Sequence, residues 1–149
     1  MLSASQQKFL TALQVKKYRQ KYRKFTLEGS KLVAELLSQN RVGVSALYGL
    51  ERWAAGNAAL LQPFYHLFNP VTEAELKKIS ALKTPQQVLA VAEIPEPALP
   101  PLQGAVSFYL DGIRDPGNLG AIIRIADWFG MTAVYLSHDC VAVFSPKVV

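Results

Sequence analysis

The sequence predicts an α/β chain in two parts, and three observations support this prediction. Predicted strands and helices alternate over residues 1–94, four prolines interrupt the chain directly after them, and a second strand–helix–strand series begins near residue 104. Such alternation is typical of layered α/β domains. Half of the 149 residues are hydrophobic, so the chain can bury a sizeable core.

Hydrophobic spacing and capping residues predict the elements of the first part. A helix is predicted over residues 3–20, because Phe9, Leu10 and Leu13 form an apolar face. Thr72 and Glu75 form a capping box, which predicts a helix ending near Leu82. The other predicted elements are strands over 25–27, 42–48, 64–68 and 88–94, a turn over 28–30, and helices over 31–39 and 51–61, the last interrupted at Gly56 and Asn57.

Four prolines between positions 95 and 101 predict a domain boundary. Proline lacks the amide hydrogen that helix interiors and central strands need, and such a run favours an extended, semi-rigid spacer. We therefore predict a first domain over 1–94, a linker over 95–103 and an incomplete second domain over 104–149.

The second part is predicted to be a βαβ unit. Residues 105–110 form an apolar strand and 111–118 a polar loop, and a helix runs from an N-cap at Asn118 to a stop at Gly130, before a strand over 132–136. Ligands bind such units beyond the carboxyl end of the first strand, where the polar loop lies. The residues predicted for the core face of the helix are Ile122, Ile125, Ala126 and Phe129.

Several classes of protein are disfavoured by what the sequence lacks. It has no signal-peptide-like amino terminus, no apolar run of about 18 residues that could span a bilayer, and a single cysteine, Cys140. These features predict a cytoplasmic protein with no membrane contact. The glycines between 117 and 120 lack a P-loop lysine, and no His, Cys or carboxylate cluster has ligand spacing, so we expect no metal.

Positive charge is concentrated at the amino terminus. Of the 16 Lys and Arg residues, seven lie within the first 24 positions, where no Asp or Glu occurs. Basic residues interleaved with tyrosines suit contacts with RNA phosphates and stacking on unpaired bases. A solvated helix face whose tyrosines pack on the domain is the alternative. The candidate RNA contacts are Lys16, Lys17, Tyr18, Arg19, Tyr22, Arg23 and Lys24.

The segment from Asp111 to Gly130 resembles the first sequence motif of the SpoU (TrmH-type) RNA 2′-O-ribose methyltransferases, within the SPOUT superfamily. Residues 145–149, which include Lys147, resemble the opening of that family's second motif. The positions that match the first motif are Asp111, Asp115, Pro116, Asn118, Gly120, Arg124, Ala126, Phe129 and Gly130.

The amino-terminal part carries a shorter resemblance. Tyr18-Arg19 and the segment 25–29 are similar to the substrate-binding domain that precedes the catalytic domain in many of these enzymes. The resemblance implies a three-layer α/β RNA-binding domain of ribosomal-protein type, followed by the opening βαβ of a SPOUT α/β knot domain. It adds Glu28 to the candidate RNA contacts, although a glutamate there can equally make a structural hydrogen bond or cap.

The resemblance implies catalytic roles for Arg124 and Asn118. A ribose 2′-hydroxyl must be oriented and must lose its proton while the neighbouring phosphate is held, and a guanidinium can grip a phosphate with paired donors. Whether Arg124 acts as a base or as a phosphate clamp stays open, and Asn118 can also be an ordinary helix cap. An ordinary surface arginine paired with Asp127 or Asp111 is the alternative for Arg124. The motif-supporting residues are Asp111, Asp115, Gly120 and Lys147.

The same resemblance implies a methyltransferase that uses S-adenosylmethionine on ribosomal or transfer RNA and is a homodimer at full length. The family's third motif, in a C-terminal knot, does not occur in residues 1–149. We therefore expect no cofactor-binding residue within this chain, and an inactive front fragment that retains RNA binding. A stand-alone, non-enzymatic RNA-binding module is the alternative.

Overall fold

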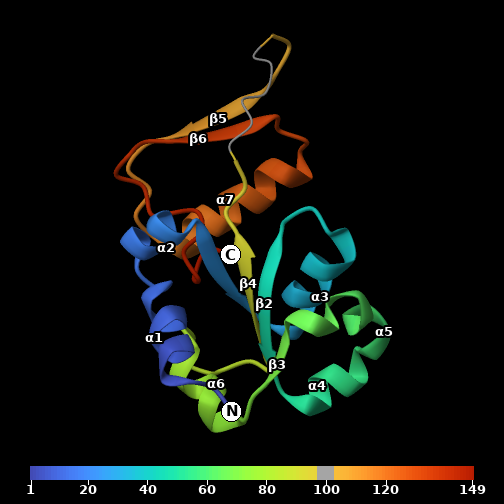
Figure 1. Cartoon of the computed structure of the whole chain (residues 1–149). Helices are drawn as coiled ribbons and strands as arrows, with labels where there is room; N and C mark the ends of the chain where they lie inside the picture. The colour runs from blue at the N-terminus through green and yellow to red at the C-terminus, as the bar shows by residue number, and fades with distance from the viewer. Residues whose placement is uncertain (97–102) are drawn as a thin grey trace. The chain divides into compact units, whose positions relative to one another are not determined.

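The computed structural model describes residues 1–96 and 103–149, which form two compact units, Met1–Pro95 and Glu96–Val149. Figure 1 shows their elements along the chain. Most of the linker predicted over 95–103 lies outside the described residues. No helix within the described ranges is long and apolar enough to cross a membrane.

Unit 1 is built on a four-stranded sheet. Its strands are β1 (Lys24–Glu28), β2 (Val44–Gly49), β3 (Phe68–Pro70) and β4 (Val88–Glu93), in the order β1-β4-β2-β3. β4 pairs antiparallel with both β1 and β2, and β3 runs parallel to β2. Residues 88–92 form an apolar run that is buried throughout, because β4 is a central strand covered on both faces.

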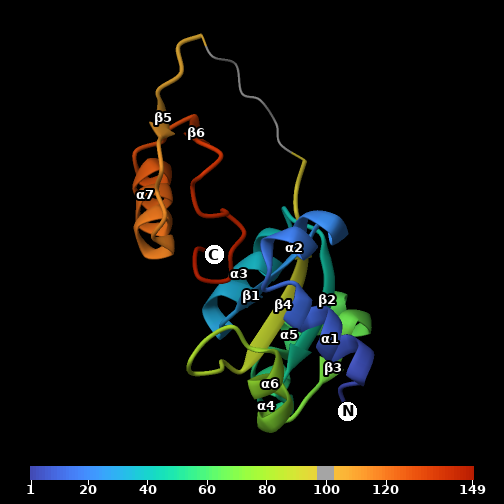
Figure 2. The same cartoon turned by 90° about the vertical axis from the view of Figure 1, so that its left-hand side faces the viewer.

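Helices cover both faces of this sheet. They are α1 (Ala4–Ala12), α2 (Lys16–Tyr22), α3 (Ser30–Gln39), α4 (Glu51–Gly56), α5 (Ala58–Leu61), the 3₁₀ helix η1 (Gln62–Leu67) and α6 (Glu73–Ile79). Leu89 and Val91 of β4 pack in one cluster with Leu10 of α1 and Leu76 of α6. Figures 1 and 2 show β4 between α1 on one side and α3 on the other. The predicted three-layer α/β arrangement is confirmed.

The helix predicted over residues 3–20 is broken in the structure. Residues 13–15 form a turn between α1 and α2. Within it, the side chain of Gln14 donates hydrogen bonds to two carbonyls at the end of α6. The buried Arg19 donates to the carbonyls of Leu13 and Gln14. The Arg19 bonds use carbonyl groups that a continuous helix over 3–20 would have bonded to its own amides.

The strand predicted over 64–68 is wrong. The chain forms η1 there, with Pro63 in its first turn, and β3 begins only at Phe68. The fixed φ of proline suits the first turn of a helix, and proline cannot donate a ladder hydrogen bond. The capping box at Thr72 is confirmed, but α6 ends at Ile79. The other predicted elements of unit 1 are confirmed to within two residues, with the break between α4 and α5 at Asn57.

Unit 2 contains the predicted βαβ unit, made of β5 (Ser107–Leu110), α7 (Pro116–Trp128) and β6 (Ala133–Leu136), with β5 and β6 parallel. α7 buries Leu119, Gly120 and Ala126. Ile125 and Phe129, predicted for the core face, are instead 50% and 71% exposed. That prediction is wrong because a two-stranded sheet covers only a narrow stripe of the helix.

Glu75 gives unit 1 a specific pH dependence. Its carboxylate accepts hydrogen bonds from the backbone amides of Thr72 at 2.9 Å and Leu2 at 2.7 Å, and these bonds lower the pKa of Glu75 from 4.5 to about 2. Because the folded-state pKa is depressed, the stabilisation is complete above pH 4.5 and is lost as the pH falls toward 2.

We expect Glu75→Gln to lower the free energy of unfolding at pH 7 and to flatten its decrease between pH 4.5 and pH 2. Urea unfolding followed by circular dichroism across this range measures the effect. Glu35→Gln, at an exposed glutamate of α3, is the matched control and should keep the wild-type pH dependence. A Glu75→Gln variant with the wild-type dependence would contradict the assignment.

Candidate functional site

The polar loop that follows β5 is fastened to the start of α7. Asp115 is the N-cap of α7, and its Oδ1 accepts a hydrogen bond from the backbone amide of Asn118 at 2.7 Å. Pro116 occupies the first turn, where a missing amide hydrogen leaves no bond unmade. Asp115 therefore sets the direction in which the helix leaves the loop.

Asn118 is not the N-cap that the sequence predicts. α7 begins two residues earlier, so Asn118 lies within the first turn and its backbone amide is the group that Asp115 caps. Its side chain is not used as a cap, and the residue is exposed beside the loop. The catalytic role of Asn118 stays a prediction.

Gly120 allows two other groups to approach α7 closely. A Cβ atom at this position would lie 3.1 Å from the carbonyl oxygen of Val148 and 3.6 Å from Nη1 of Arg124. The guanidinium of Arg124 therefore lies back over the preceding turn of α7, in the direction of the loop. The turn over 145–148, which carries the exposed Lys147, returns to the same part of the helix.

A second loop, after β6, is hydrogen-bonded to the first. Ser137 Oγ accepts from the backbone amide of Gly112 at 2.9 Å and donates to Asp139 at 2.6 Å, and this second bond lowers the pKa of Asp139. Cys140 Sγ accepts from the amide of Ile113 at 3.3 Å. The two loops, residues 111–115 and 137–141, thus form one rim at the carboxyl ends of parallel strands, which is where α/β sheets bind ligands.

Sequence reasoning alone does not find the contacts of this rim. The sequence shows Asp139 and Cys140 only as part of a turn after a strand, and Ser137 as an ordinary turn residue. The hydrogen-bond partner of Ser137 lies 25 residues away at Gly112, which adopts φ +62°. Only the parallel pairing of β5 with β6 brings the two loops together.

The rim already satisfies its own polar groups. In the described part of unit 2, no buried side-chain nitrogen or oxygen lacks a hydrogen-bond partner. Within residues 1–96 and 103–149, no three His, Cys, Asp or Glu side chains gather as they would around a metal ion. Exposed groups such as Asp111, Asn118 and Arg124 are therefore the ones that can contact a ligand.

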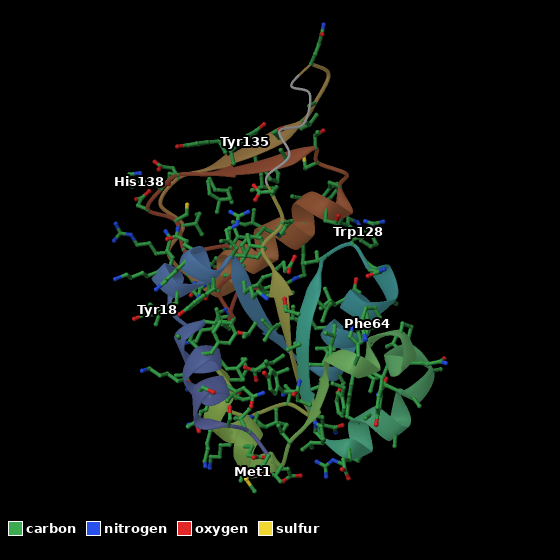
Figure 3. All side chains as sticks on the ribbon, in the orientation of Figure 1. Met1, Tyr18, Phe64, Trp128, Tyr135 and His138 are labelled. Carbon is green, nitrogen blue, oxygen red and sulfur yellow. The ribbon has the colours of Figure 1, made fainter. Side chains whose placement is uncertain are left out.

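The basic segment of unit 1 is exposed along α2. Lys16, Lys17 and Lys21 are exposed, and Tyr18 and Tyr22 lie beside them with 37% and 40% of their surface accessible. Figure 3 shows Tyr18 projecting away from the sheet. α2 therefore presents positive charge and aromatic rings together.

Arg19 does not belong to this surface. It is 4% exposed, and its Nη1 donates to the carbonyl oxygens of Leu13 at 2.9 Å and Gln14 at 2.8 Å. Burial lowers the pKa of the guanidinium. The sequence prediction that Arg19 contacts RNA does not fit this geometry, because the group is committed to the turn between α1 and α2.

The remaining basic candidates contact unit 1 itself. Arg23 ends α2 in the left-handed conformation, with φ +54°, and its Nη2 lies 3.5 Å from the carbonyl oxygen of Ile94. Lys24 Nζ donates to the Ser45 hydroxyl at 2.7 Å and is half-buried. Arg23 is exposed and can extend the basic surface, whereas Lys24 contributes less of its charge.

Glu28 makes the structural hydrogen bonds that the sequence leaves open as an alternative. One carboxylate oxygen accepts from the Ser80 hydroxyl at 2.6 Å, and the other accepts from the Ala81 amide at 2.7 Å. Both oxygens thus tie the end of β1 to the chain that follows α6. This geometry favours the structural role of Glu28 over RNA contact.

Two family models match the chain. The one described as the MRM3-like substrate binding domain matches residues 5–90, and the one described as the SpoU rRNA Methylase family matches residues 105–149. The first match covers more than half of the chain and coincides with unit 1, and the second includes the rim and α7.

Curated relatives are similar over nearly the whole chain. The 23S rRNA (guanosine(2553)-2′-O)-methyltransferase RlmP of Bacillus subtilis is 34% identical over 139 residues, which is 91% of this chain and 52% of RlmP. The mitochondrial rRNA methyltransferase 3 of Mus musculus is 30% identical over 146 residues, which is 93% of this chain and 35% of the relative. The chain thus spans about half or less of the length of these relatives.

Solved structures share the fold. An AdoMet-bound rRNA methyltransferase from Sinorhizobium meliloti matches all of this chain and 58% of its own, with a TM-score of 0.81 and 30% identity. The SpoU methyltransferase AviRb from Streptomyces viridochromogenes, in complex with AdoMet, has a TM-score of 0.81 at 22% identity over 98% of this chain and 57% of its own. The AviRb likeness is one of fold.

Arg19→Met is expected to lower the free energy of unfolding by roughly 1.5–3 kcal/mol, because two carbonyl oxygens lose a charged donor. Urea unfolding at pH 7 measures the loss. Lys17→Met, at an exposed position of the same helix, is the control and should stay within about 0.5 kcal/mol of the wild type. Equal stabilities of the two variants would remove the structural role of Arg19.

Proposed function

Because the chain belongs to the SpoU (TrmH-type) family of RNA methyltransferases, we propose that the full-length protein transfers a methyl group from S-adenosylmethionine to a ribose 2′-hydroxyl of ribosomal or transfer RNA. The observation that carries this proposal is the rim at the ends of β5 and β6, with Arg124 lying back over Gly120 toward it. The rRNA methyltransferases among the relatives support the substrate class.

Arg124 is the charged group that we assign to the reacting ribose. Each 2′-hydroxyl has a phosphate beside it, and a guanidinium holds a phosphate with paired hydrogen bonds. A phosphate held in this way orients the hydroxyl oxygen, and the positive charge favours the negative charge that develops as the hydroxyl proton leaves. Because a guanidinium has five N–H donors and no acceptor for a proton, a phosphate clamp is the simpler role for Arg124 than a base.

Asn118 is the second group that we assign to the substrate. It is exposed on the first turn of α7, and its side chain is not used as the cap. A carboxamide both donates and accepts hydrogen bonds, so it can contact ribose hydroxyls or the backbone of the loop. Asp111, exposed at the end of β5, is the neighbouring carboxylate on the same rim.

S-adenosylmethionine supplies the methyl group in this proposal. In the described part of unit 2 no buried side-chain nitrogen or oxygen lacks a hydrogen-bond partner, so no contact to the donor is derived from such groups. We assign binding of the donor, and the homodimer contact, to other segments of the full-length protein. A polypeptide of residues 1–149 is then expected to bind RNA without methylating it.

Unit 1 is the part that we assign to RNA binding. The match to a substrate-binding domain supports this assignment, and the exposed lysines of α2 supply the charge that RNA phosphates need. A stand-alone RNA-binding module would use the same surface, and the two possibilities differ in methyl transfer by the full-length protein.

Replacing Lys16, Lys17 and Lys21 by glutamine is expected to weaken binding of a stem–loop RNA roughly tenfold or more, and to reduce the slope of log affinity against log salt by about two. Fluorescence anisotropy of labelled RNA at several salt concentrations measures both. The matched control replaces Lys77, Lys78 and Lys83, three exposed lysines of α6 and the following loop. Equal losses from both triple variants would mean that α2 has no special role.

Arg124→Ala in the full-length protein is expected to lower methyl transfer by roughly 100-fold or more, with RNA affinity within about twofold of the wild type. Transfer of labelled methyl groups to ribosomal and transfer RNA measures this. Arg41→Ala, at an exposed arginine of unit 1, should keep wild-type turnover. Retained turnover in Arg124→Ala would remove Arg124 from the catalytic residues, and turnover by residues 1–149 alone would overturn the division of roles.

A further inference from the structure

A depression of about 750 Å³ lies along α1 and α2 on the surface of unit 1. The residues that matter in its lining are Lys8, Phe9 and Thr11 of α1 and Tyr18 and Tyr22 of α2. Its volume falls within the range of small-ligand pockets. We call this depression, with these five residues, the aromatic groove.

The rings of the aromatic groove are held in defined orientations. Phe9 meets Tyr22 edge to face, with ring centroids 5.2 Å apart and an interplanar angle of 71°. Tyr18 and Tyr22 are nearly parallel, with centroids 6.3 Å apart and an angle of 17°. Phe9 therefore supports Tyr22 from α1, and both tyrosines keep more than a third of their surface accessible.

Arg19 fixes the two helices that form the groove. Its guanidinium lies on the buried side of α2 and bonds the carbonyls of Leu13 and Gln14, which follow α1. α2 is thus held relative to the end of α1 before any ligand arrives. An aromatic surface that is already ordered loses less conformational entropy when it binds a ligand.

The charge around the groove favours an anionic partner. Lys8 lines it, Lys21 Nζ lies 5.6 Å from the centroid of the Tyr22 ring, and Lys16 and Lys17 are exposed at the start of α2. No Asp or Glu occurs in the first 24 residues, so nothing nearby in the sequence offsets these charges.

We infer that the aromatic groove is a seat for one unpaired nucleobase of the RNA substrate, stacked on Tyr18 or Tyr22 while the lysines contact the phosphates on either side. The inference rests on the proposed function and adds to it a preference for RNA that contains an unpaired base. In a continuous duplex each base face is covered by the neighbouring base pairs, so a tyrosine ring can stack only on a base that is bulged or looped out.

The test compares two RNAs that differ by one unpaired nucleotide, a stem–loop with a bulged adenine in its stem and the same stem–loop without the bulge. The loop is a tetraloop closed by its own stacking, so the bulge is the added unpaired base. Tyr18→Ala and Tyr22→Ala in the 149-residue chain should lower affinity for the bulged RNA roughly 5- to 100-fold, with little change for the other RNA. The salt slope should stay that of the wild type, because no charge is removed.

Three variants serve as controls. Tyr18→Phe and Tyr22→Phe keep the rings and should bind the bulged RNA within about twofold of the wild type. Tyr65→Ala removes an exposed aromatic ring that pairs with Phe68 elsewhere in unit 1, and should bind both RNAs as the wild type does. Circular dichroism of each variant shows whether it is folded.

A second measurement does not depend on any variant. With 2-aminopurine at the bulge, binding to the wild-type chain should quench its emission, because stacking on a tyrosine ring quenches that base. Unchanged emission in the saturated complex, or equal losses for both RNAs in the alanine variants, would overturn the inference. Tight binding of an acidic peptide in the groove with no effect of the bulge would do the same. If the wild-type chain binds neither RNA, the proposed RNA-binding role of unit 1 fails as well.

Discussion

The pairing of β4 with both β1 and β2 is the interaction on which unit 1 depends. Its buried residues supply apolar side chains to the helical layers on both faces of the sheet, and burial of apolar surface is the main favourable term in folding. β4 also sets the place of the amino-terminal segment, because β1 pairs with it and α2 leads almost directly into β1. The basic surface of unit 1 is therefore positioned by a strand from the other end of that unit.

The charged residues near β1 divide into those that hold the unit together and those that face solvent. Arg19 and Glu28 both give their charged atoms to hydrogen bonds within unit 1, since a buried or half-buried charge is costly unless it is paired. The lysines of α2 have no such burial and keep their charge at the surface. The Arg19 guanidinium is engaged within unit 1 and therefore does not contact RNA. Its hydrogen bonds instead hold α1 and α2, the two helices of the aromatic groove, in a fixed position.

In unit 2, too, side chains stabilise the fold through hydrogen bonds, and there their partners are backbone amides. Parallel pairing of β5 and β6 brings their carboxyl ends together, and Ser137 and Cys140 then bond the amides of the neighbouring loop. Gly120 leaves room for the carbonyl of Val148 and for the guanidinium of Arg124 on one turn of α7. A hydrogen-bonded rim beside the exposed Arg124 is an arrangement suited to orienting a substrate, in which catalysis comes mainly from position and fixed charge.

The sequence by itself determined most of the order of strands and helices, with the exception of residues 64–67, and it determined the capping box at Thr72, the βαβ unit with its family motif, and the concentration of positive charge before residue 25. These features depend on neighbouring residues, so local spacing reveals them. Only the tertiary structure decided that the first helix breaks, that Asp115 caps α7 where Asn118 is expected to, and that Ile125 and Phe129 are exposed. It also decided which charges remain at the surface, because the bond that engages Glu28 joins residues 52 positions apart and the burial of Arg19 depends on how the helices pack on the sheet.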